Sequence, residues 1–335
     1  MKVIPKHTIV QVGYIILAPI PGVLSRDCYE TLLPVITRMV NLSLDNAIVP
    51  TKFKEAALNP FIKKAPLDHE PYSSYRPISN LRFVSKATEK IVAARLDTHL
   101  RDGDLFQLFQ SAYRAGHSTE KSLTRVHNDI LCDIDDGKCV ILILLDPSYP
   151  FDTVDHSILF KRLKHRFGVK GKALAWLRSY LSKRSQFVYI ENESSSSRGL
   201  LSGVPQGSVF GPLLYSMYVA ALAEIIEKHN MSYHFYADDT QIYLSFRPSD
   251  KAEPDLSRFR IELCIQDTNC WMMANKLKLN NDKTDLLIFT TRHRPQPTLK
   301  SINAGTDLCN ASDSPKNLGV CFDNLITMEK QIILI

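Results

Sequence analysis

One apolar run that ends on a carboxylate constrains the fold more than any other stretch of the sequence. Cys139–Leu145 reads CVILILL and carries no charged or hydroxyl side chain, and Asp146 follows it directly. A continuous apolar run of this length predicts a central strand that is buried on both faces of a sheet. Asp146 is then expected at the carboxyl end of that strand.

Helical patterns lie on both sides of this strand in the chain. Apolar residues at helical spacing predict helices over residues 27–46, 85–100, 157–168, 174–181 and 255–276. Ser157 is expected to be the N-cap of the third helix, Asp155 is also interpreted as a capping residue, and Gly168 is expected at the end of the helix. Solvation is the default explanation for the polar face of that helix, and phosphate contact is the alternative. That face carries five basic residues: Lys161, Arg162, Lys164, His165 and Arg166.

Two adjacent carboxylates interrupt a second apolar stretch. In HFYADDTQIY, Asp238 and Asp239 separate two runs that each suit a short strand. One interpretation is an ordinary hairpin tip, because Asp is common in turns. The other is a metal site, because two like charges held side by side are costly unless a cation neutralises them. Asp146 offers a third carboxylate, and two-metal phosphoryl transfer uses such a set.

Composition sets broad limits on the kind of protein. The chain has 335 residues, 44% of them apolar, which is enough for one large or two smaller globular domains. Its net charge of +6 fits a nucleic-acid partner without requiring one. The seven cysteines form no CxxC pair, which argues for a reducing compartment and against zinc. Prolines interrupt the apolar stretch Thr8–Leu24, so we expect no signal peptide, no membrane partner and an intracellular protein, nuclear or cytoplasmic.

Three ordered stretches resemble one known family. LLDPSYPFDTVDH (144–156), GVPQGSVFGPLLY (203–215) and FYADDTQIY (235–243) are similar to motifs A, B and C of the reverse transcriptases of non-LTR, LINE-type retrotransposons. YRPISNLRFVSKATEKIVAARL resembles the fingers motifs, LKLNNDKTDLLIF resembles motif D, and NLGVCFDN resembles motif E. The resemblance extends from about Pro19 to the end of the chain.

The resemblance implies an α+β fold of the right-hand polymerase type, with fingers and palm and most of the thumb missing. It implies a helical extension over residues 1–47, fingers over 48–137, a palm with inserted fingers helices over 138–315, and motif E with the start of a thumb over 316–335. The implied activity is RNA-directed DNA polymerase, with Mg²⁺ or Mn²⁺ as cofactor and an RNA template, a DNA primer and deoxynucleoside triphosphates as partners. Relatives usually carry an endonuclease before this region. The oligomeric state stays open.

Roles for individual residues also follow from the resemblance. Asp146 and Asp238 match the principal metal ligands, and Asp239 matches the third acidic residue. Lys283 matches the motif D lysine that protonates the leaving pyrophosphate. The expected nucleotide-binding residues are Arg76 as a triphosphate clamp, Phe151 as the gate that excludes a 2′-hydroxyl, Gln206 and Gly207 against the nucleotide and template, and Lys63 and Lys64 as weaker candidates.

Motif A departs from the family pattern. Relatives read approximately Asp-Leu-Ser-Ala-Ala-Phe-Asp, whereas this chain has prolines at positions 147 and 150. Proline fixes φ and removes a backbone donor, so we expect a disturbed nucleotide pocket. A catalytically decayed retroelement fragment, with at most nucleic-acid binding, is therefore the alternative function. An unrelated two-metal nuclease or phosphatase would explain the carboxylates but not VPQG or YRPIS.

Overall fold

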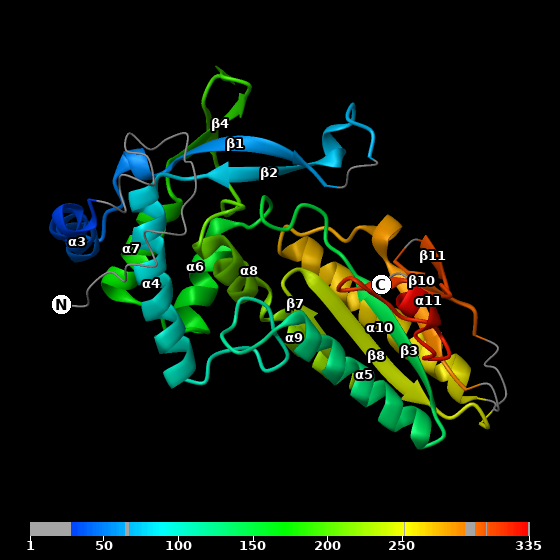
Figure 1. Cartoon of the computed structure of the whole chain (residues 1–335). Helices are drawn as coiled ribbons and strands as arrows, with labels where there is room; N and C mark the ends of the chain where they lie inside the picture. Colours follow the sequence, from blue (N-terminus) through cyan, green and yellow to red (C-terminus); the bar gives the residue numbers. More distant parts are fainter. Residues whose placement is uncertain (1–27, 64–66, 251, 292–298, 306, 334–335) are drawn as a thin grey trace. The chain divides into compact units, whose positions relative to one another are not determined.

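The computed structural model describes most of the chain (Figure 1). The described residues are 28–63, 67–250, 252–291, 299–305 and 307–333. The apolar stretch Thr8–Leu24 and Lys64 lie outside them. The chain divides into two compact units, the first formed by Met1–Phe106 and Phe151–Tyr218 and the second by Gln107–Pro150 and Val219–Ile335.

The second unit is built on an antiparallel sheet in the order β7-β8-β3-β9. Its strands are β3 (Cys139–Leu145), β7 (Ser232–Tyr236), β8 (Asp239–Phe246) and β9 (Asp285–Phe289). The central position of β3 confirms the prediction from its apolar run, and all of its residues except Leu144 are buried. Leu145 pairs with Thr240, so the register brings Asp146 to the same end of the sheet as the start of β8.

Helices cover both faces of this sheet. On one face, α5 (Thr119–Asp135) packs its buried residues against β3, β8 and β9, and Phe322 completes the core. The helix α10 (Glu253–Ala274) lies along the other face, beside α9 (Leu222–Lys228) (Figure 1). The remaining elements of the unit are η3 (Asn281–Lys283), β10 (Ser301–Ala304), β11 (Asp307–Asn310), β12 (Lys316–Asn317), β13 (Val320–Cys321) and α11 (Glu329–Ile333).

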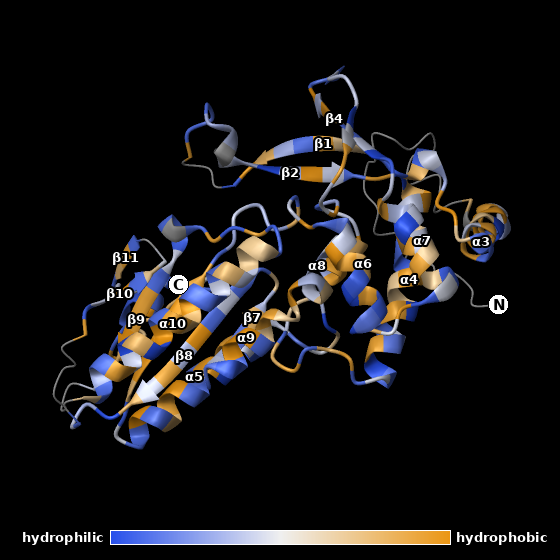
Figure 2. Cartoon of the chain, turned by 180° about the vertical axis from the view of Figure 1, so that it is seen from behind, coloured by the Kyte–Doolittle hydropathy of each residue, from blue (hydrophilic) through white to orange (hydrophobic). Residues whose placement is uncertain are grey.

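The first unit combines a sheet with several helices. Its sheet has the order β2-β1-β4-β5, with β6 also paired to β4, and β1 runs parallel to β4. The strands are β1 (Glu55–Ile62), β2 (Tyr75–Asn80), β4 (Arg184–Ile190), β5 (Glu193–Ser194) and β6 (Arg198–Leu200). The helical elements are α3 (Tyr29–Asp45), η1 (Thr51–Phe53), η2 (Tyr72–Ser74), α4 (Phe83–Asp102), α6 (His156–His165), α7 (Gly171–Leu181) and α8 (Phe210–Val219). Orange faces of these helices in Figure 2 mark their apolar sides.

Five predicted helices are present as α3, α4, α6, α7 and α10, with one wrong detail. The N-cap of α6 is Asp155 and not Ser157, because the Asp155 carboxylate accepts the N–H of Ile158 at 3.0 Å. Ser157 instead donates its hydroxyl to Asp155 at 2.6 Å. These bonds hold the pKa of the Asp155 carboxyl below its usual value. A carboxylate caps more strongly here because it accepts both donors at once.

The basic face of α6 is only partly a surface feature. Lys161, Lys164 and His165 are exposed, as predicted for a solvated or phosphate-binding face. Arg162 instead donates to the main-chain carbonyl of Tyr218, and its guanidinium lies 4.7 Å from the centre of the Tyr218 ring. The predicted boundaries of extension, fingers and palm stay a prediction.

Candidate active site

The three candidate carboxylates all belong to the second unit and are positioned by strand ends. Asp146 follows β3, while Ala237 and Asp238 form the two-residue turn between β7 and β8, where Tyr236 pairs with Asp239. The prediction of a hairpin tip is therefore confirmed. Ala237 has φ of 58°, a left-handed conformation that costs a residue with a Cβ about 1–2 kcal/mol. Neighbouring groups must therefore hold this turn in place.

The electrostatics of this end of the sheet join the carboxylates and one lysine. Lys283, at the end of η3, places its Nζ 2.8 Å from Oδ2 of Asp146. Partial burial and the negative charges of Asp238 and Asp146 raise the pKa of Asp239 to about 7, and Lys283 acts in the opposite direction. The structure thus brings together the four residues for which the sequence predicts metal binding and proton transfer.

The donor set fits a hard divalent cation. Within the residues that the structure describes, no three His, Cys, Asp or Glu side chains form a ready metal cage. Mg²⁺ at polymerase-type sites is usually held by one or two carboxylates together with substrate phosphates, and not by an all-protein cage. Carboxylate oxygens are its preferred protein ligands, and a cation would relieve the repulsion that raises the pKa of Asp239.

Pro147 fits the backbone of motif A, contrary to the expected disturbance at this position. Pro147 and Leu279 form an antiparallel bridge whose hydrogen bonds come from their neighbours. The N–H of Ser148 donates to the carbonyl of Lys278 at 2.7 Å, and the N–H of Asn280 donates to the carbonyl of Asp146 at 2.9 Å. An N–H at position 147 would point away from this ladder, so proline removes no hydrogen bond from it.

The motif B loop belongs to the first unit and lies against its sheet. Ser79 in β2 donates its N–H to the carbonyl of Gln206 at 2.7 Å. Gly207 has φ of 101°, and a Cβ there would lie 3.0 Å from the carbonyl oxygen of Ser79. Val204 donates its N–H to the carbonyl of Phe151 at 2.8 Å. The loop is thereby fixed between β2 and the end of motif A.

The other predicted nucleotide-binding residues also lie in the first unit. The Phe151 ring is half-buried, with its centre 5.1 Å from that of Tyr215. Arg76 is exposed on β2 and pairs with Phe61 of β1, and Lys63 is exposed at the end of the same hairpin. A pocket of about 360 Å³ lies in the same unit, with Leu58, Ser79, Gln186 and Gln206 among its lining residues, whereas Arg76, Phe151 and Lys63 do not line it.

Sequence reasoning missed two buried side chains that hold these motifs. The Glu89 carboxylate of α4 accepts the N–H of Val209, directly before α8, at 2.8 Å. It also accepts the hydroxyl of Tyr180, in α7, at 3.0 Å. Burial raises the pKa of Glu89. Gln110 contacts the turn at Ala237. Glu89 follows Ser85 by four positions, so both lie on one face of α4, and this spacing could have indicated a buried polar pair. No local sequence pattern marks Gln110.

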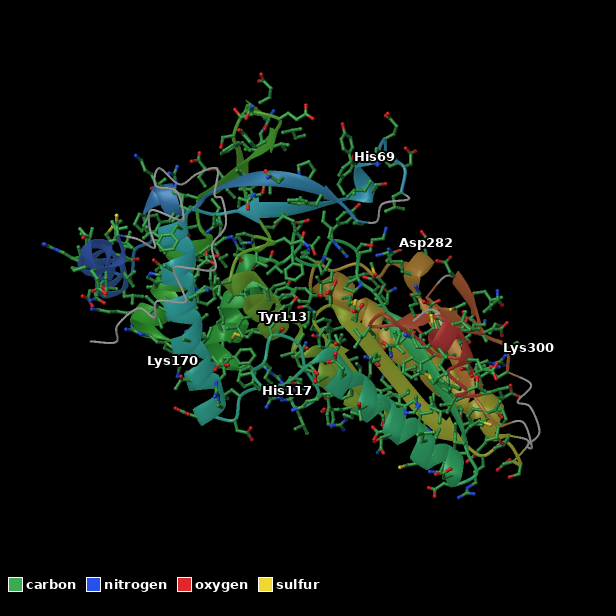
Figure 3. All side chains as sticks on the ribbon, in the orientation of Figure 1. His69, Tyr113, His117, Lys170, Asp282 and Lys300 are labelled. Carbon is green, nitrogen blue, oxygen red and sulfur yellow. The ribbon has the colours of Figure 1, made fainter. Side chains whose placement is uncertain are left out.

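A buried histidine beside the turn makes stability depend on pH. His234 is 3% exposed, and its Nε2 lies 2.9 Å from the Ser111 hydroxyl. Burial, followed by the nearby charges of Arg125 and His117, lowers the pKa of His234 to about 4. His117 and Tyr113, which are labelled in Figure 3, belong to the loop before α5 that also carries Ser111. His234 is therefore neutral in the folded protein at neutral pH.

Unfolding should consequently become easier as the pH falls. The unfolded chain protonates His234 near its ordinary pKa, so it binds more protons than the folded chain between about pH 6.5 and pH 4. We expect this group to reduce the free energy of unfolding by about 2 kcal/mol between pH 7 and pH 5. Urea unfolding of the wild type and of His234→Gln at both pH values measures this, and equal pH dependences would contradict the assignment.

Comparison with known proteins identifies the family. Residues 62–322 match the family model described as reverse transcriptase (RNA-dependent DNA polymerase). The chain belongs to the reverse transcriptase family, and its fold is that of fingers and palm. The solved structure of apo telomerase from Candida tropicalis, truncated from its C-terminal domain, covers 86% of this chain at a TM-score of 0.55; this chain covers 58% of it, and 13% of aligned residues are identical, so this likeness concerns the fold alone.

The relatives confirm the resemblance to non-LTR elements. The probable RNA-directed DNA polymerase from transposon BS of Drosophila melanogaster is 30% identical over 92% of this chain and 34% of its own length. The RNA-directed DNA polymerase from mobile element jockey of the same species is 26% identical over 90% of this chain and 32% of its own length. The chain thus spans about a third of the length of these relatives.

Proposed function

We propose that this chain carries the polymerase site of an RNA-directed DNA polymerase, which adds deoxynucleotides to the 3′-hydroxyl of a DNA primer on an RNA template. The observation that supports this most is the convergence of Asp146, Asp238, Asp239 and Lys283 at one end of the central sheet. An unrelated two-metal enzyme would need the carboxylates but not the motif B loop packed on the YRPIS strand.

Asp146 and Asp238 are the residues that would hold the divalent ions, with Asp239 as the third acidic residue. When bound, Mg²⁺ or Mn²⁺ would supply charge stabilisation for the triphosphate and would lower the pKa of the primer hydroxyl. The strand end and the turn orient the carboxylates before substrate arrives. Because the pKa of Asp239 is raised to about 7 in the absence of a cation, neutral to basic solution favours the full set of charges.

Arg76, Phe151, Gln206 and Gly207 are the residues that would hold the nucleotide. Arg76 offers a guanidinium fork for phosphate oxygens, with Lys63 and Lys64 as additional positive charges. Phe151 would exclude a 2′-hydroxyl through its ring, which Tyr215 supports. The left-handed Gly207 allows close approach of the backbone, and the Gln206 amide offers a donor and an acceptor to sugar or base.

Replacement of Lys283 tests its role as the acid that protonates pyrophosphate. Lys283→Met should lower the rate of nucleotide addition by about a hundredfold, since general acids contribute at least that much. Lys283→Arg keeps a positive charge next to Asp146 but releases no proton at neutral pH, so the same loss is expected. Single-nucleotide incorporation measures both variants, with the exposed Lys278→Met as control. A rate for Lys283→Arg near that of the wild type would leave only an ion-pair role.

The setting of this activity is also a proposal. A soluble protein of an intracellular compartment, nuclear or cytoplasmic, is consistent with seven free cysteines. By length and composition, Phe210–Lys228 could cross a membrane, but 67% of its apolar window is buried, as in the core of a soluble protein.

The alternative function, a catalytically decayed fragment, loses one supporting argument, because Pro147 keeps the hydrogen bonds of the motif A ladder intact. Primer extension on RNA separates the two.

A further inference from the structure

Gln110 reaches the turn that carries the paired carboxylates from a separate segment of the second unit. Gln110 forms a parallel bridge with Phe235 near the end of β7. In this bridge, Phe235 donates its N–H to the carbonyl of Phe109 at 2.8 Å, and Ser111 donates its N–H to the carbonyl of Phe235 at 3.1 Å. The bridge holds Gln110 with only 5% of its surface exposed, alongside the strand that leads into the turn.

The Gln110 amide bonds both main-chain polar groups of Ala237. Its Oε1 accepts the N–H of Ala237 at 3.2 Å, and its Nε2 donates to the carbonyl of Ala237 at 3.4 Å. The same Oε1 also accepts the N–H of Ala112 at 2.9 Å, which anchors the side chain to its own segment. Two N–H groups point at Oε1, so the opposite orientation of the amide would place donors against donors.

These bonds act on a residue that would otherwise leave its conformation easily. Ala237 has φ of 58° and directly precedes Asp238. A residue with a Cβ avoids this region unless its surroundings hold it there. Rotation at Ala237 would move the Asp238 carboxylate relative to Asp146, because Ala237 and Asp238 together form the turn. A displacement of about 1 Å near reacting groups can cost a hundredfold in rate.

We propose that Gln110 is a positioning residue, which holds Ala237 in its left-handed conformation and thereby fixes Asp238 and Asp239 for nucleotide addition. The kinetic consequence rests on the proposed polymerase function, whereas the contact with the turn does not. Gln110 touches no substrate in this role. It acts through the backbone of the turn alone.

The test compares Gln110→Met with Gln107→Met in the full chain. Gln107 is a matched control, because its amide also braces β7, through the Tyr233 hydroxyl at 2.5 Å, but at a distance from the turn. Hydrogen exchange resolved at the Ala237 amide should be at least about tenfold faster in Gln110→Met, because the bond to Oε1 is lost. Gln107→Met should leave it unchanged. The kcat of primer extension should fall about ten- to a hundredfold in Gln110→Met, with KM for the nucleotide within about twofold.

A second substitution locates the effect at Ala237. Glycine adopts left-handed φ without a Cβ clash, so Gln110→Met combined with Ala237→Gly should recover part of the lost kcat. Unchanged exchange at Ala237, faster exchange with unchanged kcat, equal losses in Gln107→Met, or no recovery in the double variant would each overturn the proposal. If the wild type itself extends no primer, the polymerase function fails, and the exchange rates alone then decide whether Gln110 holds the turn.

Discussion

Asp238→Asn should lower the rate of nucleotide addition at least about a thousandfold, which corresponds to about 4 kcal/mol of lost transition-state stabilisation. The substitution keeps the size of the side chain and removes the charge that a divalent cation needs. In the absence of a cation, the charge of Asp238 repels that of Asp239. Because Asp238→Asn removes this repulsion, we expect the free energy of unfolding of the variant to be no lower than that of the wild type. Single-nucleotide incorporation under saturating substrate measures the rate.

Asp282→Asn is the matched control for this experiment. Asp282, which is labelled in Figure 3, is an exposed carboxylate in η3, next to Lys283 in the chain, and it is not one of the candidate ligands. Its substitution changes the net charge by the same amount, so it separates a local effect from a general loss of negative charge. We expect a rate within about twofold of the wild type. An Asp238→Asn rate within tenfold of the wild type would exclude Asp238 from the catalytic set.

Gly203→Ala should destabilise the first unit by about 2–4 kcal/mol. Gly203 has φ of 85°, and a Cβ there would lie 2.8 Å from the carbonyl oxygen of Asp152 and 3.0 Å from that of Phe151. Both obstacles are backbone atoms, which cannot rotate away as a side chain can. The His156 ring also bonds the carbonyl of Gly203 at 2.7 Å, so the loop has little freedom to retreat.

Gly171→Ala separates the cost of φ from the cost of the close contact. Gly171, at the start of α7, has φ of 56°, and a Cβ there would meet no atom of the described residues within 4 Å, so only the conformational cost of about 1 kcal/mol applies. Urea unfolding in a Trp271→Phe background leaves Trp176 as the remaining tryptophan, and Trp176 is buried in the first unit. Equal losses for the two alanine variants would show that the contact at Gly203 contributes nothing.

Local pattern was sufficient for much of the fold. The apolar run before Asp146 predicted the central strand, because a strand that is buried on both faces needs no polar side chain. One interpretation of the pair Asp238 and Asp239 was a hairpin tip, because Asp is common in turns, and the structure has that tip. Ordered motifs then placed these carboxylates and Lys283 in one candidate site, which no single motif would have justified.

Long-range hydrogen bonding could not be predicted in this way. Whether Pro147 damages motif A depends on which of its neighbours bond to Leu279 and its flanking residues, more than a hundred positions later in the chain. The bonds from Gln110 to Ala237 likewise join segments that no spacing rule connects. The sequence indicated both Asp155 and Ser157 as capping residues, and they differ by two positions, which is within the usual uncertainty of helix ends, so the choice of Asp155 became clear only from its bond to Ile158.

The central claim is that this chain carries a working polymerase site, and primer extension tests it most directly. The purified chain is incubated with a labelled DNA primer on an RNA template, Mg²⁺ and all four deoxynucleoside triphosphates. We predict extension that disappears with a chelator and in Asp238→Asn. The absence of extension by the wild type, while circular dichroism shows that it is folded, would contradict the claim, and extension by Pro147→Leu/Pro150→Ala alone would then place the defect in motif A.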